Sequence, residues 1–212
     1  SMRVAVRRAV VQALQTTFVV AKGVRPYEVL MLGGDDLLIA CRADKALPFA
    51  LAYAEALQGI PLVDDSPPLD VGIGVAIAKA SYPFHRLHEL AEARAASAKR
   101  LYRADDSLGS VIDWQVVTNS WFDDVAEARR SADFRRYTVD QVNHVEESVV
   151  LSRRPYPVLG EDGLQGLLAS VVRLKASEER AQSVARSPLR ALRSAFEAGR
   201  RSGQMAFDRL DE

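Results

Sequence analysis

The clearest chemical signal in the sequence is a run of two glycines and two aspartates, namely Gly33, Gly34, Asp35 and Asp36. The run lies between two apolar segments, residues 27–32 and 37–41, which predict two strands joined by a tight turn. Glycine suits such a turn because it reaches positive φ without a Cβ penalty and lets a phosphate come close. Adjacent carboxylates suit Mg²⁺, which leaves its other positions to water and substrate phosphates. The alternative is a surface hairpin whose acidic side chains are solvated.

Two histidines form a second candidate site. His85 and His88 are three residues apart in a segment with helical spacing, and Glu89 and Glu92 follow them. This set could ligate zinc, but the sequence offers no evident third ligand, and a solvated helical face is the alternative. Basic pairs such as Arg129-Arg130 and Arg153-Arg154 could contact RNA or a nucleotide, or could be solvated.

The composition limits the partners that charge alone could attract. The 212 residues contain 28 basic and 28 acidic side chains, so an anionic partner must be bound by local arrangement. Cys41 is the single cysteine, which excludes an internal disulfide and a cysteine-based zinc site. Its apolar strand predicts a buried thiol, and we therefore expect a reducing, cytoplasmic location. No apolar run approaches the roughly 20 residues that cross a bilayer, so we expect no membrane partner.

The elements that must position the candidate turn alternate between helices and strands. We expect helices over residues 3–22, 46–58 and 84–103, and strands over residues 70–77 and 110–117 in addition to the hairpin. Asp70 is interpreted as a turn residue at the start of its strand, and Asp113 as a hydrogen-bonded structural acid. This order predicts an α+β fold in which helices cover one face of a mainly antiparallel sheet.

The pattern is weaker after residue 120. Residues 123–136 predict a short helix and an irregular crossing, and residues 149–156 predict a strand that ends at a proline. Two amphipathic helices are expected at residues 163–179 and 188–210. The sequence therefore predicts a first domain over residues 1–157 and a small α-helical subdomain over residues 158–212.

The hairpin motif, the Gly72-x-Gly74 strand, and the helix with Ala91-Glu92 and Ala98-Lys99 together resemble a known family. They are similar to the polymerase-like palm domain of the large subunit of type III CRISPR effector complexes, which act in antiviral defence. That palm is related to the GGDEF diguanylate cyclases, and Gly-Gly-Asp-Asp is the CRISPR spelling of the motif. Arg154-Pro155-Tyr156 and Ser187-Pro188-Leu189 resemble the tail of standalone relatives.

The resemblance implies a ferredoxin-like palm that binds ATP or GTP with Mg²⁺ or Mn²⁺ and joins nucleotides by attack of a 3′-hydroxyl on an α-phosphate. In that reading Asp35 and Asp36 are the catalytic metal ligands, and Gly33 and Gly34 leave space for the nucleotide. Lys99 would meet the phosphates as a point charge. The alternative for Lys99 is a solvated lysine favoured by the dipole at a helix end.

The resemblance also implies a first strand, ahead of the helix that precedes the hairpin, with a further metal-binding aspartate. Residues 1–26 contain no acidic side chain, so this strand lies upstream of Met2 or is missing from the protein. Two aspartates alone would hold a metal weakly. A catalytically inactive palm that senses a nucleotide, or a scaffold that contacts RNA or CRISPR-type partner subunits, therefore stays open, and an oligomer is compatible with each of these functions.

Overall fold

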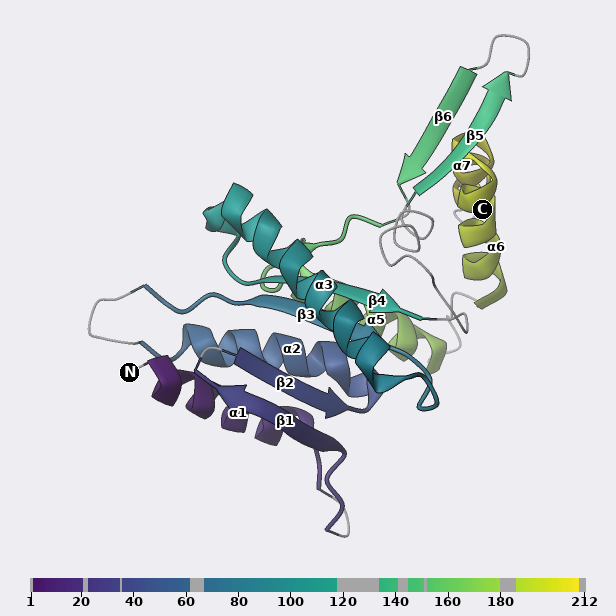
Figure 1. Ribbon diagram of the computed structural model, residues 1–212. Coiled ribbons are helices and arrows are strands. Elements are labelled where there is room, and N and C mark those ends of the chain that lie inside the picture. The colour runs from purple at the N-terminus through teal and green to yellow at the C-terminus, as the bar shows by residue number, and fades with distance from the viewer. Residues whose placement is uncertain are drawn as a thin grey trace. The chain divides into compact units, whose positions relative to one another are not determined.

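The computed structural model describes residues 2–20, 23–34, 36–61, 67–117, 134–140, 145–150, 152–179 and 186–209, and it is a mixed α+β structure with small sheets (Figure 1). Its contacts divide the chain into two compact units. The first comprises Ser1–Ser120 and Arg154–Leu168, and the second comprises Trp121–Arg153 and Ala169–Glu212. The boundary predicted after residue 157 stays a prediction, since compact units and domains need not coincide.

Two helices, α1 (Met2–Thr17) and α2 (Ala43–Gln58), form the core of the first unit. The predicted apolar stripe of α1 is confirmed, because side chains three and four residues apart are buried against α2. The helix ends earlier than the predicted residue 22, before the exposed β-branched pair Val19-Val20. The buried cluster consists of Val6, Ala9, Val10, Ala13, Phe18, Phe49, Tyr53, Ala56 and Leu57.

The predicted hairpin is confirmed. Strands β1 (Tyr27–Gly33) and β2 (Asp36–Cys41) pair antiparallel, with an irregularity between Val29 and Met31. One side of the hairpin packs against the α1–α2 cluster through partly buried side chains that include Leu37 and Ile39. These positions alternate along β2, as expected for a strand with one buried face.

A second sheet lies over α2. Strands β3 (Gly72–Ile77) and β4 (Val111–Val116) pair in parallel, and β7 (Tyr156–Pro157) pairs antiparallel with β4. Helix α3 (Phe84–Ala104) and the short 3-10 turn η1 (Asp106–Leu108) connect β3 to β4. Parallel neighbours require such a crossover, which is usually a helix.

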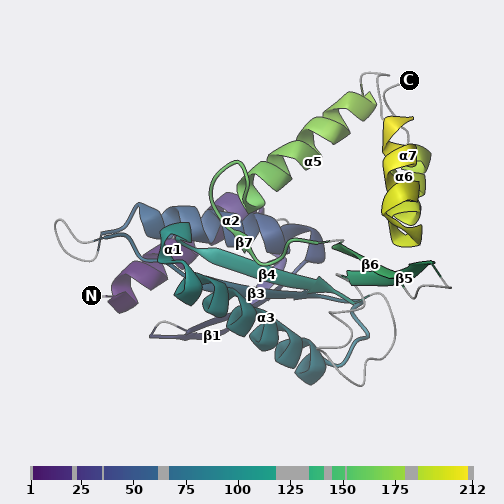
Figure 2. The same cartoon turned by 90° about the horizontal axis from the view of Figure 1, so that it is seen from above.

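The two faces of this sheet are covered by different helices (Figure 2). Ile73 and Ile112 point toward Ala50 and Ala54 of α2, whereas Gly74 lies directly under α3. The expectation of a mainly antiparallel sheet with helices on one face is therefore wrong for β3 and β4. The reason is the alternation along β3, where small residues on one face admit α3 and branched residues on the other pack on α2.

The second unit contains a hairpin that the sequence did not predict. Strands β5 (Phe134–Asp140) and β6 (Val145–Val150) pair antiparallel, so residues 134–136 form a strand in a segment for which a short helix and an irregular crossing were expected. The rest of that segment, residues 123–133, lies outside the described residues. The predicted strand over residues 149–156 is also divided, because β6 ends at Val150 and β7 begins at Tyr156.

The C-terminal region is helical, as predicted. Helix α5 (Leu164–Glu179) matches the expected range closely, beginning in the first unit. The second predicted helix is divided into α6 (Arg186–Ala198) and α7 (Arg200–Asp208). Gly199 has a φ of 144° at the break, a conformation that favours glycine.

Candidate functional site

The glycine-aspartate turn closes the hairpin. Gly33 is the last residue of β1 and pairs with Asp36, the first residue of β2, so the connection has two residues. Gly34 has a φ of 67°, the left-handed conformation that such a turn requires. The Asp36 side chain is exposed. Asp35 lies outside the described residues, and its role as a metal ligand stays a prediction.

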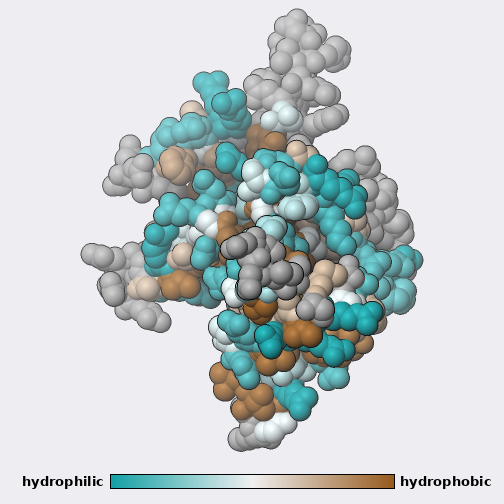
Figure 3. Space-filling model, turned by 90° about the vertical axis from the view of Figure 1, so that its left-hand side faces the viewer, coloured by the Kyte–Doolittle hydropathy of each residue, from teal (hydrophilic) through white to brown (hydrophobic). Residues whose placement is uncertain are grey.

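The turn is surrounded by open space. A Cβ atom built on Gly33 or on Gly34 would have no other heavy atom within 4 Å, apart from its chain neighbours. Figure 3 shows this side of the molecule, on which hydrophilic and hydrophobic residues are interspersed. The turn therefore leaves room for a ligand to reach its backbone, as predicted for the two glycines, while the described side chains form no enclosing wall around it.

Lys99 lies near the carboxyl end of α3, and its side chain is exposed. The stem of this side chain lies against the first residue of β3, because a Cβ on Gly72 would be 2.6 Å from Lys99 Cγ. In Figure 1 the arrows of β2 and β4 point the same way, and β3 is parallel to β4. One end of the first unit therefore carries the candidate turn at the start of β2. The start of β3 and the carboxyl end of α3 lie at the same end.

Asp70, which precedes β3 at the same end, is held by hydrogen bonds within the fold. Its Oδ1 accepts from Gln58 Nε2 at 3.2 Å and from Ser110 Oγ at 3.3 Å. The backbone N–H of Val71 donates to Ser110 Oγ at 3.1 Å. These bonds join the end of α2 to the starts of β3 and β4, which fits the interpretation of Asp70 as a turn residue.

The candidate zinc ligands occupy one face of α3. His88 Nε2 lies 3.7 Å from Glu92 Oε1, and Arg86 Nη1 lies 3.1 Å from Glu89 Oε2, while His85 is exposed. In the part of the chain that the structure describes, no group of three or more His, Cys, Asp or Glu side chains is placed to hold a metal ion. Asp35 is not among these described residues. Ion pairs between neighbouring turns account for these side chains as a solvated helical face.

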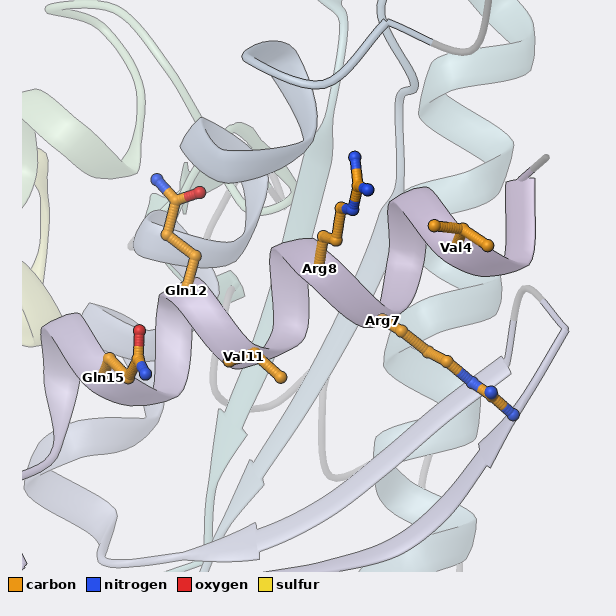
Figure 4. Close-up of a pocket in the computed structure, with 6 residues that line it drawn as sticks. All are labelled: Val4, Arg7, Arg8, Val11, Gln12 and Gln15. Carbon is orange, nitrogen blue, oxygen red and sulfur yellow. The ribbon is translucent and has the colours of Figure 1, made fainter.

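A shallow hollow of about 460 Å³ lies on the outer side of α1 (Figure 4). It is lined by Val4, Arg7, Arg8, Val11, Gln12 and Gln15. Figure 4 shows that the guanidinium groups of Arg7 and Arg8 point away from each other, so they do not converge on one anion. The hollow therefore lacks the convergent polar groups that define a ligand site.

Sequence reasoning missed one buried charge. Arg94 of α3 is 5 % exposed, and its Nη1 lies 3.9 Å from Oδ2 of Asp113, which is fully buried on β4. The interpretation of Asp113 as a structural acid is consistent with this partner. The available signal was the position of Arg94 within the apolar stripe of α3, one turn after Leu90.

Tyr53 is buried in the α1–α2 cluster, whereas Cys41, which was expected to be buried, is only partly buried against that cluster. Burial raises the pKa of the Tyr53 phenol to about 12. Burial, followed by the nearby Asp44 carboxylate, raises the pKa of the Cys41 thiol. Cys41 ends β2, at the opposite end of the strand from the turn. Neither group contributes to the candidate site.

No protein-family model matches the chain, and a search of curated proteins found no significant match. Among the described residues, no helix is long and apolar enough to cross a membrane.

Proposed function

We propose that the first unit is a nucleotide-binding palm of the CRISPR polymerase and cyclase type, which binds ATP or GTP with Mg²⁺ or Mn²⁺ at the hairpin turn. The observation that carries the proposal is the common location of three features. The turn with Asp36, the start of β3 and the side chain of Lys99 all lie at one end of the first unit. A carboxylate and an ammonium group at one end of the same unit suit a metal-bound polyphosphate.

The strand edges of the first unit support the same proposal. Within the described residues β2 is paired only with β1, and β3 only with β4, although β2 and β3 both contribute to the α1–α2 cluster. Figure 1 shows α2 behind the space that separates these two strands. In a ferredoxin-like palm the first strand lies between the corresponding strands, antiparallel to both. The arrangement therefore leaves the position of that strand open.

Each group has a defined task in this proposal. The carboxylates of Asp36 and Asp35 would hold the metal ion, and the donor chemistry fits because Asp36 is an exposed carboxylate beside an open turn. The bound metal would neutralise phosphate charge and orient the phosphates. Gly33 and Gly34 let the nucleotide approach the backbone, and Lys99 adds a positive charge near the phosphates.

Nucleotide joining by 3′-hydroxyl attack is the further step of the proposal, and binding without turnover is the alternative. Joining would need a further carboxylate on the metal, and Asp70 is an aspartate at this end of the unit. Gln58 and Ser110 already donate hydrogen bonds to one of its carboxylate oxygens, which favours binding without turnover. Chromatography of products formed from ATP, GTP or their mixture distinguishes these alternatives.

Calorimetry with the Asp35→Ala, Asp36→Ala double variant tests the site. We expect the double variant to lose the Mg²⁺-dependent part of ATP or GTP binding and to keep its thermal stability. Glu28→Gln is the matched control, because it removes an exposed carboxylate from the same hairpin at a position away from the turn, where Glu28 pairs with Ala40. Equal affinity in parent and double variant would reject the site.

Lys99→Ala provides an independent test of the phosphate contact. We expect this variant to weaken triphosphate binding more than monophosphate binding, because the lost charge interaction depends on the phosphates within reach. Arg100→Ala, which removes the neighbouring exposed cation of α3, is the control. Equal losses for both nucleotides would return Lys99 to the solvated-helix interpretation.

A further inference from the structure

Helix α3 meets β3 through an interface of small residues. A Cβ built on Gly74 would lie 2.0 Å from the carbonyl oxygen of Ala91 and 2.3 Å from the backbone N of Ala95. The helix backbone therefore rests directly on the strand at this glycine. On this face β3 has only Gly72, Gly74 and Ala76, so the strand itself offers no large side chain that would interlock with the helix and fix its position along the strand.

A buried ion pair lies beside this close approach. Asp113 is the register partner of Gly74, and its carboxylate faces Arg94, which lies on α3 between Ala91 and Ala95. Both side chains are almost completely buried. Burying two charges is costly, and such a pair is weak evidence for stability by itself. The best-attested use of a buried polar pair is to specify one packing register over others.

The position of α3 also determines where Lys99 lies. Lys99 follows Arg94 by five residues on the same helix, and its stem crosses Gly72, two residues before Gly74. A shift of the helix by one turn would move Lys99 by about 5 Å along the strand. The location of Lys99 beside the start of β3, at the end of the unit that carries the turn, thus depends on the register of α3.

We propose that Arg94 and Asp113 are positioning residues that fix the register of α3 on β3 and β4, and thereby hold Lys99 at the end of the unit that carries the hairpin turn. The ligand part of this inference rests on the proposed function. The register part does not, because it concerns the packing of α3 alone.

The test replaces the pair with apolar residues of similar size, in the Arg94→Met, Asp113→Leu double variant. Single substitutions would leave one charge buried without its partner, and such variants are expected to unfold easily. The control is Arg86→Gln with Glu89→Gln, which removes an exposed ion pair from the same helix. Arg94→Lys, which keeps a cation opposite Asp113, is the conservative variant.

The register is measured by electron spin resonance distances between labels at Gln12 of α1 and Arg100 of α3, both exposed, in a Cys41→Ala background. We expect one narrow distance distribution in the parent, the control and Arg94→Lys. The double variant should remain folded and show an additional population displaced by about 5 Å, one helical turn. Its preference for triphosphate over monophosphate should fall to the level of Lys99→Ala.

A folded double variant with the single parental distance would overturn the inference, because the pair would then contribute to packing alone. If this double variant does not fold, the Arg94→Gln, Asp113→Asn double variant decides, because it removes both charges and keeps polar groups of similar size, and an unchanged single distance again overturns the inference. If the parent binds no nucleotide, the proposed function fails while the distance measurement still tests the register.

Discussion

The β1–β2 hairpin and the β3–β4 pair are supported in different ways by the same helical layer. The hairpin has one face on the α1–α2 cluster and exposes Leu30 and Met31, each about 45 % exposed. The β3–β4 pair lies between α2 and α3, and the first three residues of β4 are fully buried. The candidate metal-binding turn is thus on the strand pair with less support, whereas β4, in the other pair, is buried on both faces at its start.

This difference shows that residue type alone does not reveal what a position requires. Gly33 and Gly74 are both glycines within strands, yet a side chain at Gly33 would enter open space and one at Gly74 would meet the backbone of α3. The first position leaves room for a ligand, and the second leaves room for a helix. Substitutions in the two regions should therefore have very different effects.

Gly74→Val should have the largest effect. Its Cβ would overlap backbone atoms of Ala91 and Ala95, which cannot rotate away, so we expect a loss of more than about 4 kcal/mol in the free energy of unfolding. Gly33→Ala, the matched change in the hairpin, should alter stability by about 0.5 kcal/mol or less. Urea unfolding followed by circular dichroism measures both. Similar losses for the two variants would contradict the comparison.

Ile112→Ala should have the next largest effect. Ile112 of β4 is fully buried against α2, and its truncation to alanine leaves a cavity. We therefore expect a loss of about 3 kcal/mol in the free energy of unfolding. Leu30→Ala in the hairpin removes a side chain that is 45 % exposed and should cost less than about 1 kcal/mol. The same unfolding experiment applies. A cost for Leu30→Ala equal to that for Ile112→Ala would indicate that the outer face of the hairpin is covered in solution.

A smaller effect should appear at high pH, in the core beneath the hairpin. The pKa of Tyr53 in the folded protein is about 12, against 10.0 for the free side chain. Because the raised pKa means that folding favours the neutral phenol, this stabilisation is complete below about pH 10 and is lost as the pH rises through 12. The loss is of the order of 2–3 kcal/mol.

Chemical unfolding of the parent and of Tyr53→Phe at pH 8–12 measures this loss. The difference in free energy of unfolding between the two proteins should be constant up to about pH 10. Above that pH the parent should lose stability relative to Tyr53→Phe. Phenylalanine is the matched control because it keeps the ring that stacks on Phe49. Parallel curves over the whole range would show that Tyr53 ionises freely and that this part of the core is open to water.

The local elements of the first unit could be predicted from the sequence because their signals are local. The glycine-rich turn between apolar runs predicted β1 and β2, and helical spacing predicted α1, α2 and α3. The pairing of β3 with β4 could not be predicted in this way. The parallel pairing of β3 with β4 depends on contacts between residues about 40 apart in the chain, for which the sequence contains no direct signal.

The second unit was less predictable for physical reasons. Residues 134–136, Phe-Arg-Arg, continue a charged stretch of the sequence, and their strand becomes defined only by pairing with β6. The break between α6 and α7 depends on the conformation of Gly199, which an amphipathic pattern does not reveal.

The turn between β1 and β2 and the place of Lys99 near the end of α3 could be predicted from the motif and its order, whereas the buried partner of Asp113 could not. The roles of Gly33, Gly34, Asp35, Asp36 and Lys99 in a site stay predictions. Arg94 is a charged residue within an apolar stripe, and its structural role can be recognised only from the strand that packs against it.

The first unit is built from two separate stretches of the chain, because residues 121–153 belong to the second unit. The two stretches are therefore synthesised at different times. Residues Val158 and Leu164 are fully buried in the cluster with Ala50, Ala54 and Ile112, and the N–H of Val158 donates to Ser110. These residues leave the ribosome only after the whole of residues 121–153. Until then the core over α2 has an uncovered side and β4 has an unpaired edge. The nascent first unit is thus expected to depend on chaperones or on delayed collapse until β7 and the start of α5 are made.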